Sequence, residues 1–127
     1  MLDPEVRRVF EGTPLAHLAT VQEDGAPHAV PVWVGTRGDQ IVFLTGPQAR
    51  KVRNIRHEPR VALSIAPEDS PWRPVVVRGH VTGWLDGDEG WAVVDELARK
   101  YTGNPYPREE ERIVALIEPD RQTVGIG

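Results

Sequence analysis

The chain has 127 residues and a formal net charge of −4, with 15 Lys and Arg against 19 Asp and Glu. This length fits a single domain, residues 1–127, with one hydrophobic core. The negative balance argues against a general nucleic-acid binder, because such proteins gain affinity by neutralising phosphates. The sequence has no Cys, which excludes disulfides, thiol nucleophiles and Cys-ligated zinc.

Hydrophobic residues make up 39% of the chain, and no apolar run approaches the roughly 18 residues of a membrane span. The first residues, MLDPEVRRVFEG, lack the basic and apolar regions of a secretion signal. We therefore expect a cytoplasmic protein with no membrane association. Twelve Gly and twelve Pro are spread along the chain, which favours many short strands joined by tight turns.

The first half of the chain predicts a short helix followed by strands. Asp3 and Pro4 fit the cap and the first position of a helix whose apolar stripe ends at Gly12. Turn residues then separate three segments rich in apolar residues. We expect these segments to form an antiparallel meander, with strands at residues 15–21, 29–34 and 40–45.

The second half predicts two helices among further strands. A helix is expected from Ala49 to Pro59, because apolar residues recur there at helical spacing. Another is expected over residues 89–101, where one face is apolar. Gly79 and Gly83 interrupt a long strand, which suggests bulges or the bending of a barrel. The strands of this half are expected at residues 61–66, 74–85, 112–117 and 121–126.

The most informative segment is RKVRNIRHEPR, residues 50–60, which contains five basic residues and one acidic residue, Glu58. Arg50, Lys51 and Asn54 lie on adjacent helical rows, opposite the apolar stripe that faces the core. The turn before the helix brings free backbone N–H groups to the same region. This pattern favours one phosphate as ligand, and a solvated basic surface is the alternative.

Several runs of the sequence resemble one protein family over nearly the whole chain, from Pro14 to Gly125. The runs are LATVQEDGAPHAVPVWV, FLTGPQARKVRNIRHEPRVAL, VVVRGHVTGWL, KYTGNPYP and ERIVALIEPDR. They resemble the pyridoxamine 5′-phosphate oxidase-like FMN-binding split β-barrel superfamily, and most of all its short F420 (deazaflavin)-dependent oxidoreductase branch. The most specific piece is a spaced signature made of Thr45, Lys51, Arg53, Asn54, Pro59 and Arg60.

The resemblance implies a mainly β (α+β) fold, a six- to seven-stranded antiparallel split β-barrel with a few short flanking helices. It also implies a homodimer with cofactor sites at the subunit interface, a small-molecule substrate and coenzyme F420 as cofactor. In such families the strand at 30–33 lies against the ring, and residues 43–45 with Arg50, Lys51 and Asn54 hold the ribityl phosphate. The partner subunit supplies part of the strand around 77–79. The implied cofactor-binding residues are Val30, Pro31, Val32, Trp33, Phe43, Leu44, Thr45, Arg50, Lys51, Asn54, Val77, Arg78 and Gly79.

The sequence lacks a nucleophile elbow, a Walker loop, His-Glu-x-x-His and any acidic or histidine cluster with metal spacing. Flavin and deazaflavin enzymes need few catalytic side chains, because the cofactor itself transfers the hydride. We therefore expect an F420-dependent oxidoreductase without a metal. An FMN flavoprotein and a non-catalytic flavin-binding module stay open as alternatives. Arg53, Arg56 and Arg60 would suit the anionic tail of F420 and tilt the choice towards it.

Individual aromatic and histidine residues permit two interpretations each. His28 could face the cofactor and donate a proton, although a surface or hydrogen-bonded histidine is the commoner outcome. Trp33 is expected near the ring, whereas Trp72 could cover a ring or form a dimer contact. Tyr101 and Tyr106 bracket the run TGNP, and we favour a structural role for them in ordering that loop.

Overall fold

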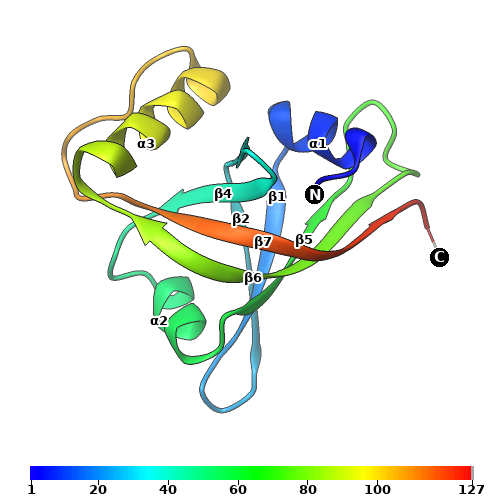
Figure 1. The fold of residues 1–127 in the computed structure, drawn as a ribbon, viewed down its shortest axis with the longest axis horizontal. Helices are drawn as coiled ribbons and strands as arrows, with labels where there is room; N and C mark the ends of the chain where they lie inside the picture. The colour runs from blue at the N-terminus through cyan, green and yellow to red at the C-terminus, as the bar shows by residue number, and fades with distance from the viewer. Residues whose placement is uncertain (127) are drawn as a thin grey trace.

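The computed structural model describes residues 1–126, and these form three helices and seven strands (Figure 1). All strand pairs are antiparallel, in one sheet of order β2-β1-β5-β6-β7-β4-β3. The predicted mainly β fold, a six- to seven-stranded antiparallel sheet with a few short helices, is therefore confirmed, with seven strands observed. The elements are α1 (Pro4–Glu11), β1 (Ala16–Val21), β2 (Pro27–Val32), β3 (Val34–Arg37), β4 (Gln40–Thr45), α2 (Arg50–His57), β5 (Arg60–Ile65), β6 (Val75–Leu85), α3 (Gly87–Thr102) and β7 (Ile113–Val124).

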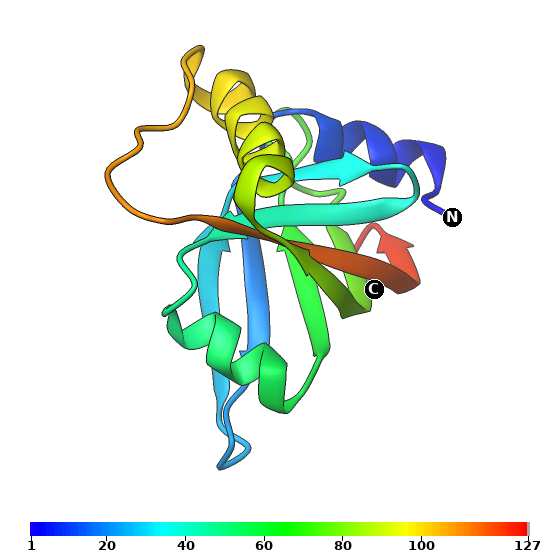
Figure 2. The same ribbon diagram turned by 60° about the vertical axis from the view of Figure 1, so that its left-hand side comes forward.

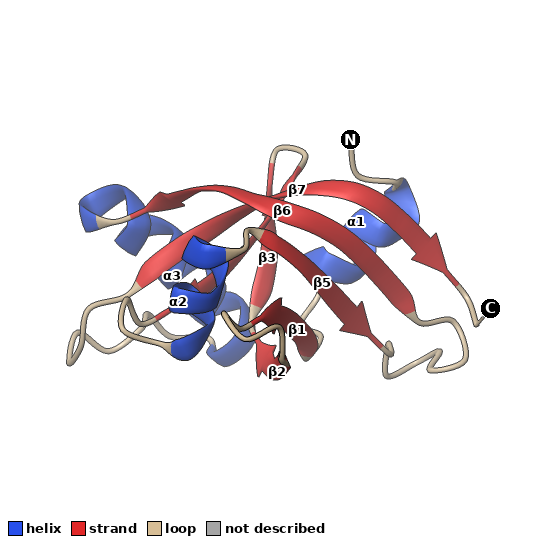
Figure 3. Ribbon diagram, turned by 90° about the horizontal axis from the view of Figure 1, so that it is seen from below, coloured by secondary structure: helices blue, strands red, loops and turns tan. Residues whose placement is uncertain are grey.

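The two edge strands of the sheet, β2 and β3, are neighbours in the chain and are separated only by Trp33. The sheet must therefore curl until its two edges meet at this residue, although the edges do not pair with each other. Figure 3 shows this curl, with β6 and β7 arching over β1, β2 and β5, and Figure 2 shows the same strands from another side. The result is a barrel that is split along the seam between β2 and β3.

The predicted meander is wrong in its second half. The β1–β2 hairpin forms, with Gly25 in the left-handed region at its turn. However, the segment expected as one strand at 29–34 breaks at Trp33, and its last part becomes β3, which pairs with β4 rather than with β2. The reason is that the chain crosses here from one edge of the sheet to the other.

The two strands predicted near the C-terminus are one long strand, β7, which pairs with both β4 and β6. Pro119 lies inside it, opposite Gly79, where the register between β6 and β7 shifts. A bulge accommodates proline because the ladder is already interrupted there. A second shift lies between Val81 and Gly83, so the bulges predicted at the two glycines of β6 are confirmed.

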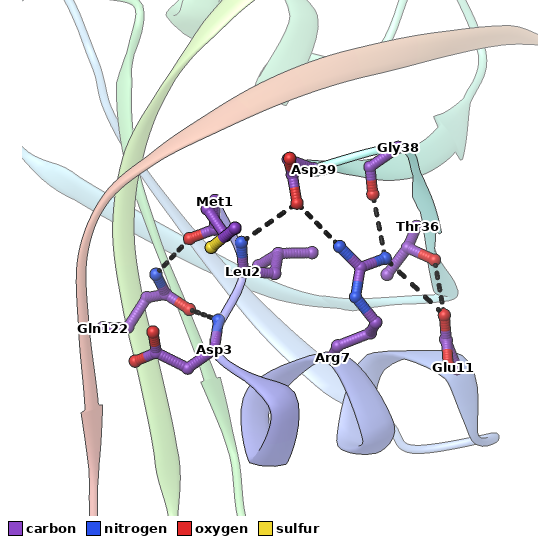
Figure 4. A network of polar contacts seen from close by, with 9 residues as sticks. All are labelled: Met1, Leu2, Asp3, Arg7, Glu11, Thr36, Gly38, Asp39 and Gln122. Carbon is purple, nitrogen blue, oxygen red and sulfur yellow. Dashed lines mark hydrogen bonds and ion pairs between the residues drawn. The ribbon is translucent and has the colours of Figure 1, made fainter.

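The core fills the inside of the curled sheet. Fully buried side chains from most strands pack there with Val6 and Phe10 of α1, which closes one end of the barrel. Arg7 fixes α1 to the turn between β3 and β4, through Asp39 at 2.7 Å and the carbonyl of Gly38 at 2.9 Å (Figure 4). In residues 1–126 no helix has the length and apolarity to cross a membrane.

Candidate functional site

A cleft of about 830 Å³ lies beside the seam of the barrel. Its walls come from the ends of β2 and β4, the turn at residues 46–49, the first turn of α2 and the loop before β7. The volume falls within the range of about 300–1,000 Å³ that is typical of small-molecule sites. The lining includes the cations Lys51 and Arg112, the acids Glu110 and Glu111, and apolar side chains around Trp33. We call the surroundings of the two cations the cationic end of the cleft and those of Trp33 the aromatic end.

Lys51 provides one of the two cations in the cleft. It lies in the first turn of α2 and is half-buried. Burial, followed by the nearby charge of Arg112, lowers the pKa of Lys51 from its usual 10.5. Within residues 1–126 the ammonium group has no carboxylate within ion-pair distance. Two neighbouring cations, one of them without an acidic partner, favour a bound anion.

Arg112 is the second cation, and its side chain is only 19% exposed. Its Nε donates to the hydroxyl of Tyr106 at 3.1 Å, and its Nη1 donates to the carbonyl of Glu111 at 2.8 Å. Nη1 also lies against Gly46, where an added Cβ would be 3.3 Å away. The carboxylate of Glu110, 3.3 Å from Nη1, is 75% exposed. Arg112 is therefore held rigidly at the turn before α2.

Sequence reasoning missed Arg112, although it expected a strand to begin there. Arg112 reaches the cleft because β4 pairs with β7, so that Thr45 lies opposite Ile113. This pairing joins segments almost seventy residues apart, and nothing in the local sequence indicates it. The only available signal was the position of an Arg directly before an apolar strand.

Trp33 forms the aromatic end of the cleft. Its ring stacks on Tyr101 with the centroids 5.0 Å apart and the planes 7° apart, and it meets the ring of Tyr106 edge-on at 6.3 Å. Leu15, which is 57% exposed, and Pro31 line the same end. This end offers flat, apolar surface of the kind that packs against a planar ring.

Asp95 of α3 fixes the loop that carries Tyr106. Its carboxylate accepts the backbone N–H of Tyr106 at 3.0 Å and two hydrogen bonds from Arg108 at 2.7 and 2.9 Å. The hydrogen bonds from Arg108 are the main reason why the pKa of Asp95 falls to about 2. Arg108 also lies over the ring of Trp91 at 3.9 Å. The loop after α3 is therefore ordered against the cleft.

The structure brings some of the residues expected at the site together and not others. Phe43 and Val77 are fully buried in the core, so their side chains face away from the cleft. Gly79 lies opposite the bulge of β7, while Arg50 and Arg78 are exposed and Val30 packs against the core. The expected residues that line the cleft are Pro31, Val32, Trp33, Leu44, Thr45 and Lys51.

Asn54 does not lie on the exposed basic face of α2, as the helical pattern suggested. It is buried, 3% exposed, and its Nδ2 donates to Oγ1 of the buried Thr20 at 3.0 Å. The prediction of the face is wrong because α2 turns Asn54 as well as Val52 and Ile55 towards the sheet. A buried amide requires a partner, and Thr20 on β1 supplies it.

The remaining candidates lie outside the cleft. Trp72 is 65% exposed in the loop between β5 and β6, and Trp84 lies under Arg56. His28 has its Nδ1 buried without a hydrogen-bond partner in residues 1–126, but it does not line the cleft. Within the same residues no group of three or more acidic or histidine side chains is placed to hold a metal ion.

The chain is similar to several solved structures. A protein named F420 reductase has 28% identity and a TM-score of 0.84, with 96% of this chain and 98% of that chain covered. A conserved hypothetical protein from Mycobacterium tuberculosis has 23% identity and a TM-score of 0.81, covering 98% and 84% of the two chains. General Stress Protein 26 from Bacillus anthracis has 17% identity and a TM-score of 0.71, covering 93% and 88%.

A search of the curated proteins gives no match. In contrast, the family model described as pyridoxamine 5′-phosphate oxidase matches residues 2–122, which is almost the whole of the described chain. The split barrel, with a cleft at its seam, agrees with this match. The chain therefore belongs to the pyridoxamine 5′-phosphate oxidase family.

Proposed function

We propose that this protein is an F420-dependent oxidoreductase that transfers a hydride between the deazaflavin and a small conjugated organic substrate. The observation that carries the proposal is the division of the cleft into a cationic end, with Lys51 and Arg112, and an aromatic end at Trp33. A ligand with a phosphate at one end and a planar ring at the other fits this arrangement. Hydride exchange is the chemistry that such a cofactor supplies when bound.

The chain's own residues bind and orient the ligand in this proposal. Lys51 and Arg112 would hold the phosphate, together with Thr45 and backbone N–H groups at the start of α2. Glu110 is mostly exposed and would turn to solvent when the phosphate takes its place on Arg112. Trp33 and Pro31 would cover part of the ring and exclude water from it.

FMN is the second candidate ligand, since it carries the same phosphate, ribityl chain and a similar ring. F420 is favoured by the similarity to the protein named F420 reductase. Of the cations expected to serve its tail, Arg60 is paired with Glu58 at 2.7 Å and Arg56 lies over Trp84. Arg53 is exposed on α2 and is the tail contact we propose.

A fluorescence titration of the purified protein with F420 and, separately, with FMN tests the proposal, because Trp33 reports on the ring. We expect tight binding of F420 and weak binding of FMN, followed by hydride transfer to conjugated acceptors. Preference for FMN would assign the protein to the second candidate. Binding without turnover of any acceptor would indicate a non-catalytic module, and no binding of either ligand would refute the proposal.

Substitutions of the two cations test the proposed phosphate site. We expect Lys51→Ala and Arg112→Ala each to weaken binding of the cofactor by about 1.5–3 kcal/mol, the contribution of a hydrogen bond to a charged group. Arg53→Ala is the matched control for FMN, since it removes a cation from the same helix outside the cleft. Equal losses of FMN affinity in all three variants would mean that only the overall charge matters.

We also propose that the protein acts as a homodimer that covers the cleft with a second copy. The outer surface of the sheet beside the cleft carries a row of small residues in register, Ala29, Ala19 and Ala62, which we call the alanine face. Exposed Val21 and Leu15 flank this row. Flat apolar surface of this kind supports burial against another copy.

A further inference from the structure

The N–H and carbonyl groups of Val34 lie at the seam of the barrel. Within residues 1–126, no neighbouring strand pairs with them on this side. Val34 begins the edge strand β3 and pairs only with Phe43 of β4. Its N–H donates to the hydroxyl of Tyr101 at 3.1 Å, and its carbonyl accepts from Nζ of Lys100 at 2.6 Å. Two consecutive side chains at the end of α3 thus take the place of a neighbouring strand.

The hydroxyl of Tyr101 also joins two segments of the cleft wall. While it accepts from Val34, it donates to the carbonyl of Pro14 at 2.6 Å. Trp33 directly precedes Val34, and Leu15 directly follows Pro14, and both line the cleft. One hydroxyl group therefore bridges the two backbones that carry the apolar walls.

Lys100 and the ring of Tyr101 extend this connection. Nζ of Lys100 donates to the carbonyl of Phe10 at 3.0 Å as well as to Val34, which ties the end of α1 to the seam. The ring of Tyr101 stacks on Trp33 at 5.0 Å. Trp33 itself belongs to no strand, so these contacts take over the role that ladder hydrogen bonds play elsewhere.

We infer that Tyr101, assisted by Lys100, is a positioning residue that sets the spacing of Leu15 and Trp33 and thereby the affinity of the cleft for a planar ring. This inference rests on the proposed function for the identity of the ring. The cationic end is built from other elements, α2 and the loop before β7. Loss of the Tyr101 hydroxyl should therefore affect ring recognition and leave phosphate recognition intact.

The variant Tyr101→Phe tests the inference by calorimetric titration, because it keeps the stacked ring and removes both hydroxyl bonds. F420 and FMN should bind about tenfold more weakly, because the two walls are no longer preorganised for the ring before it binds. D-ribitol 5-phosphate, which lacks the ring, should bind with unchanged affinity. The matched control is Thr36→Val. It removes a different hydroxyl hydrogen bond, which Thr36 of β3 donates to Glu11 of α1 (Figure 4).

A second measurement on the free protein separates this inference from the proposed function. Acrylamide quenching of Trp33, taken as the difference from a Trp33→Phe variant, should increase in Tyr101→Phe and in Lys100→Met but not in Thr36→Val. Unchanged quenching, or an equal loss of affinity for D-ribitol 5-phosphate, would overturn the inference. If neither F420 nor FMN binds the unmodified protein, the proposed function fails, and the quenching still decides the role of Tyr101.

Discussion

The two lysines of the chain, Lys51 and Lys100, are both half-buried and both have a lowered pKa, yet their surroundings differ. Burial lowers the pKa of Lys100 to about 8, and its ammonium group donates to two backbone carbonyls. Lys51 faces the cleft beside Arg112, with no carboxylate partner within residues 1–126. Lys100 is therefore engaged in the fold, whereas Lys51 retains capacity for a ligand.

The binding of a phosphate should therefore be accompanied by protonation of Lys51. The free protein holds the pKa of Lys51 below 10.5, and a bound anion would raise it again by favouring the charged form. Affinity should then fall as the pH rises through the pKa of the free protein. Titration calorimetry at several pH values between neutrality and 10.5, in buffers of different ionisation enthalpy, should detect proton uptake on binding. Lys51→Met should abolish this uptake, and persistence of the full uptake would exclude Lys51 from the site.

The residues of the site were predictable to different degrees. Lys51 and Thr45 follow from the basic segment and the turn before it, Trp33 follows from the family resemblance, and all three line the cleft. Arg112 was missed because the pairing of two distant strands, rather than a motif, brings it there. Asn54 was placed on the wrong side of its helix. The pattern of polar residues along the helix does not show that the buried Thr20 of another element accepts a hydrogen bond from its side chain.

The strand β6 contains Gly79 and Gly83, and the sequence predicted a bulge or bend at both. The atoms that surround the two glycines nevertheless differ. A Cβ added at Gly79 would overlap the backbone carbonyl of Glu118, and backbone has little freedom to move away. A Cβ added at Gly83 would lie 3.8 Å from Leu116, at ordinary contact distance. Only the first glycine is therefore required by close packing between β6 and β7.

Gly79→Ala should lower the free energy of unfolding by about 1–3 kcal/mol, the usual cost of overpacking. Gly83→Ala is the matched control and should be neutral or stabilising by about 0.4–1 kcal/mol, since alanine restricts the unfolded chain. Urea unfolding of both variants measures the difference. Similar stabilities for the two variants would show that β7 can shift to accept a side chain opposite Gly79.

Local patterns predicted most elements and failed at their connections. The helices and most of the strands lie close to where periodicity and turn residues indicated. The break at Trp33 was hidden, because a single apolar residue between Val32 and Val34 carries no turn signal. Pro119 lies in the gap between the two strands predicted at 112–117 and 121–126, whereas the bulge opposite Gly79 lets β7 continue through it. Both errors concern pairing between strands, which depends on contacts far apart in sequence.

In the split barrel, the edge strand β2 is protected against pairing with another strand, whereas one face of the sheet remains open to packing. Pro27 and Pro31 lie in β2 and cannot donate ladder hydrogen bonds, which disfavours the addition of another strand to this edge. The alanine face beside it carries small side chains that permit close approach of a flat surface. A second copy is therefore expected to pack on the face of the sheet rather than to extend its edge.

Ala19→Arg should disrupt this proposed dimer, because it places a long charged side chain in the middle of the alanine face. Ala92→Arg makes the same change on an exposed position of α3 and should leave the dimer intact. Sedimentation velocity measures the outcome. A monomeric wild-type protein, or equal dissociation of both variants, would contradict the proposal. The second copy is proposed to cover the aromatic end of the cleft. Ala19→Arg should therefore also weaken binding of F420 or FMN more than binding of D-ribitol 5-phosphate, which lacks the ring.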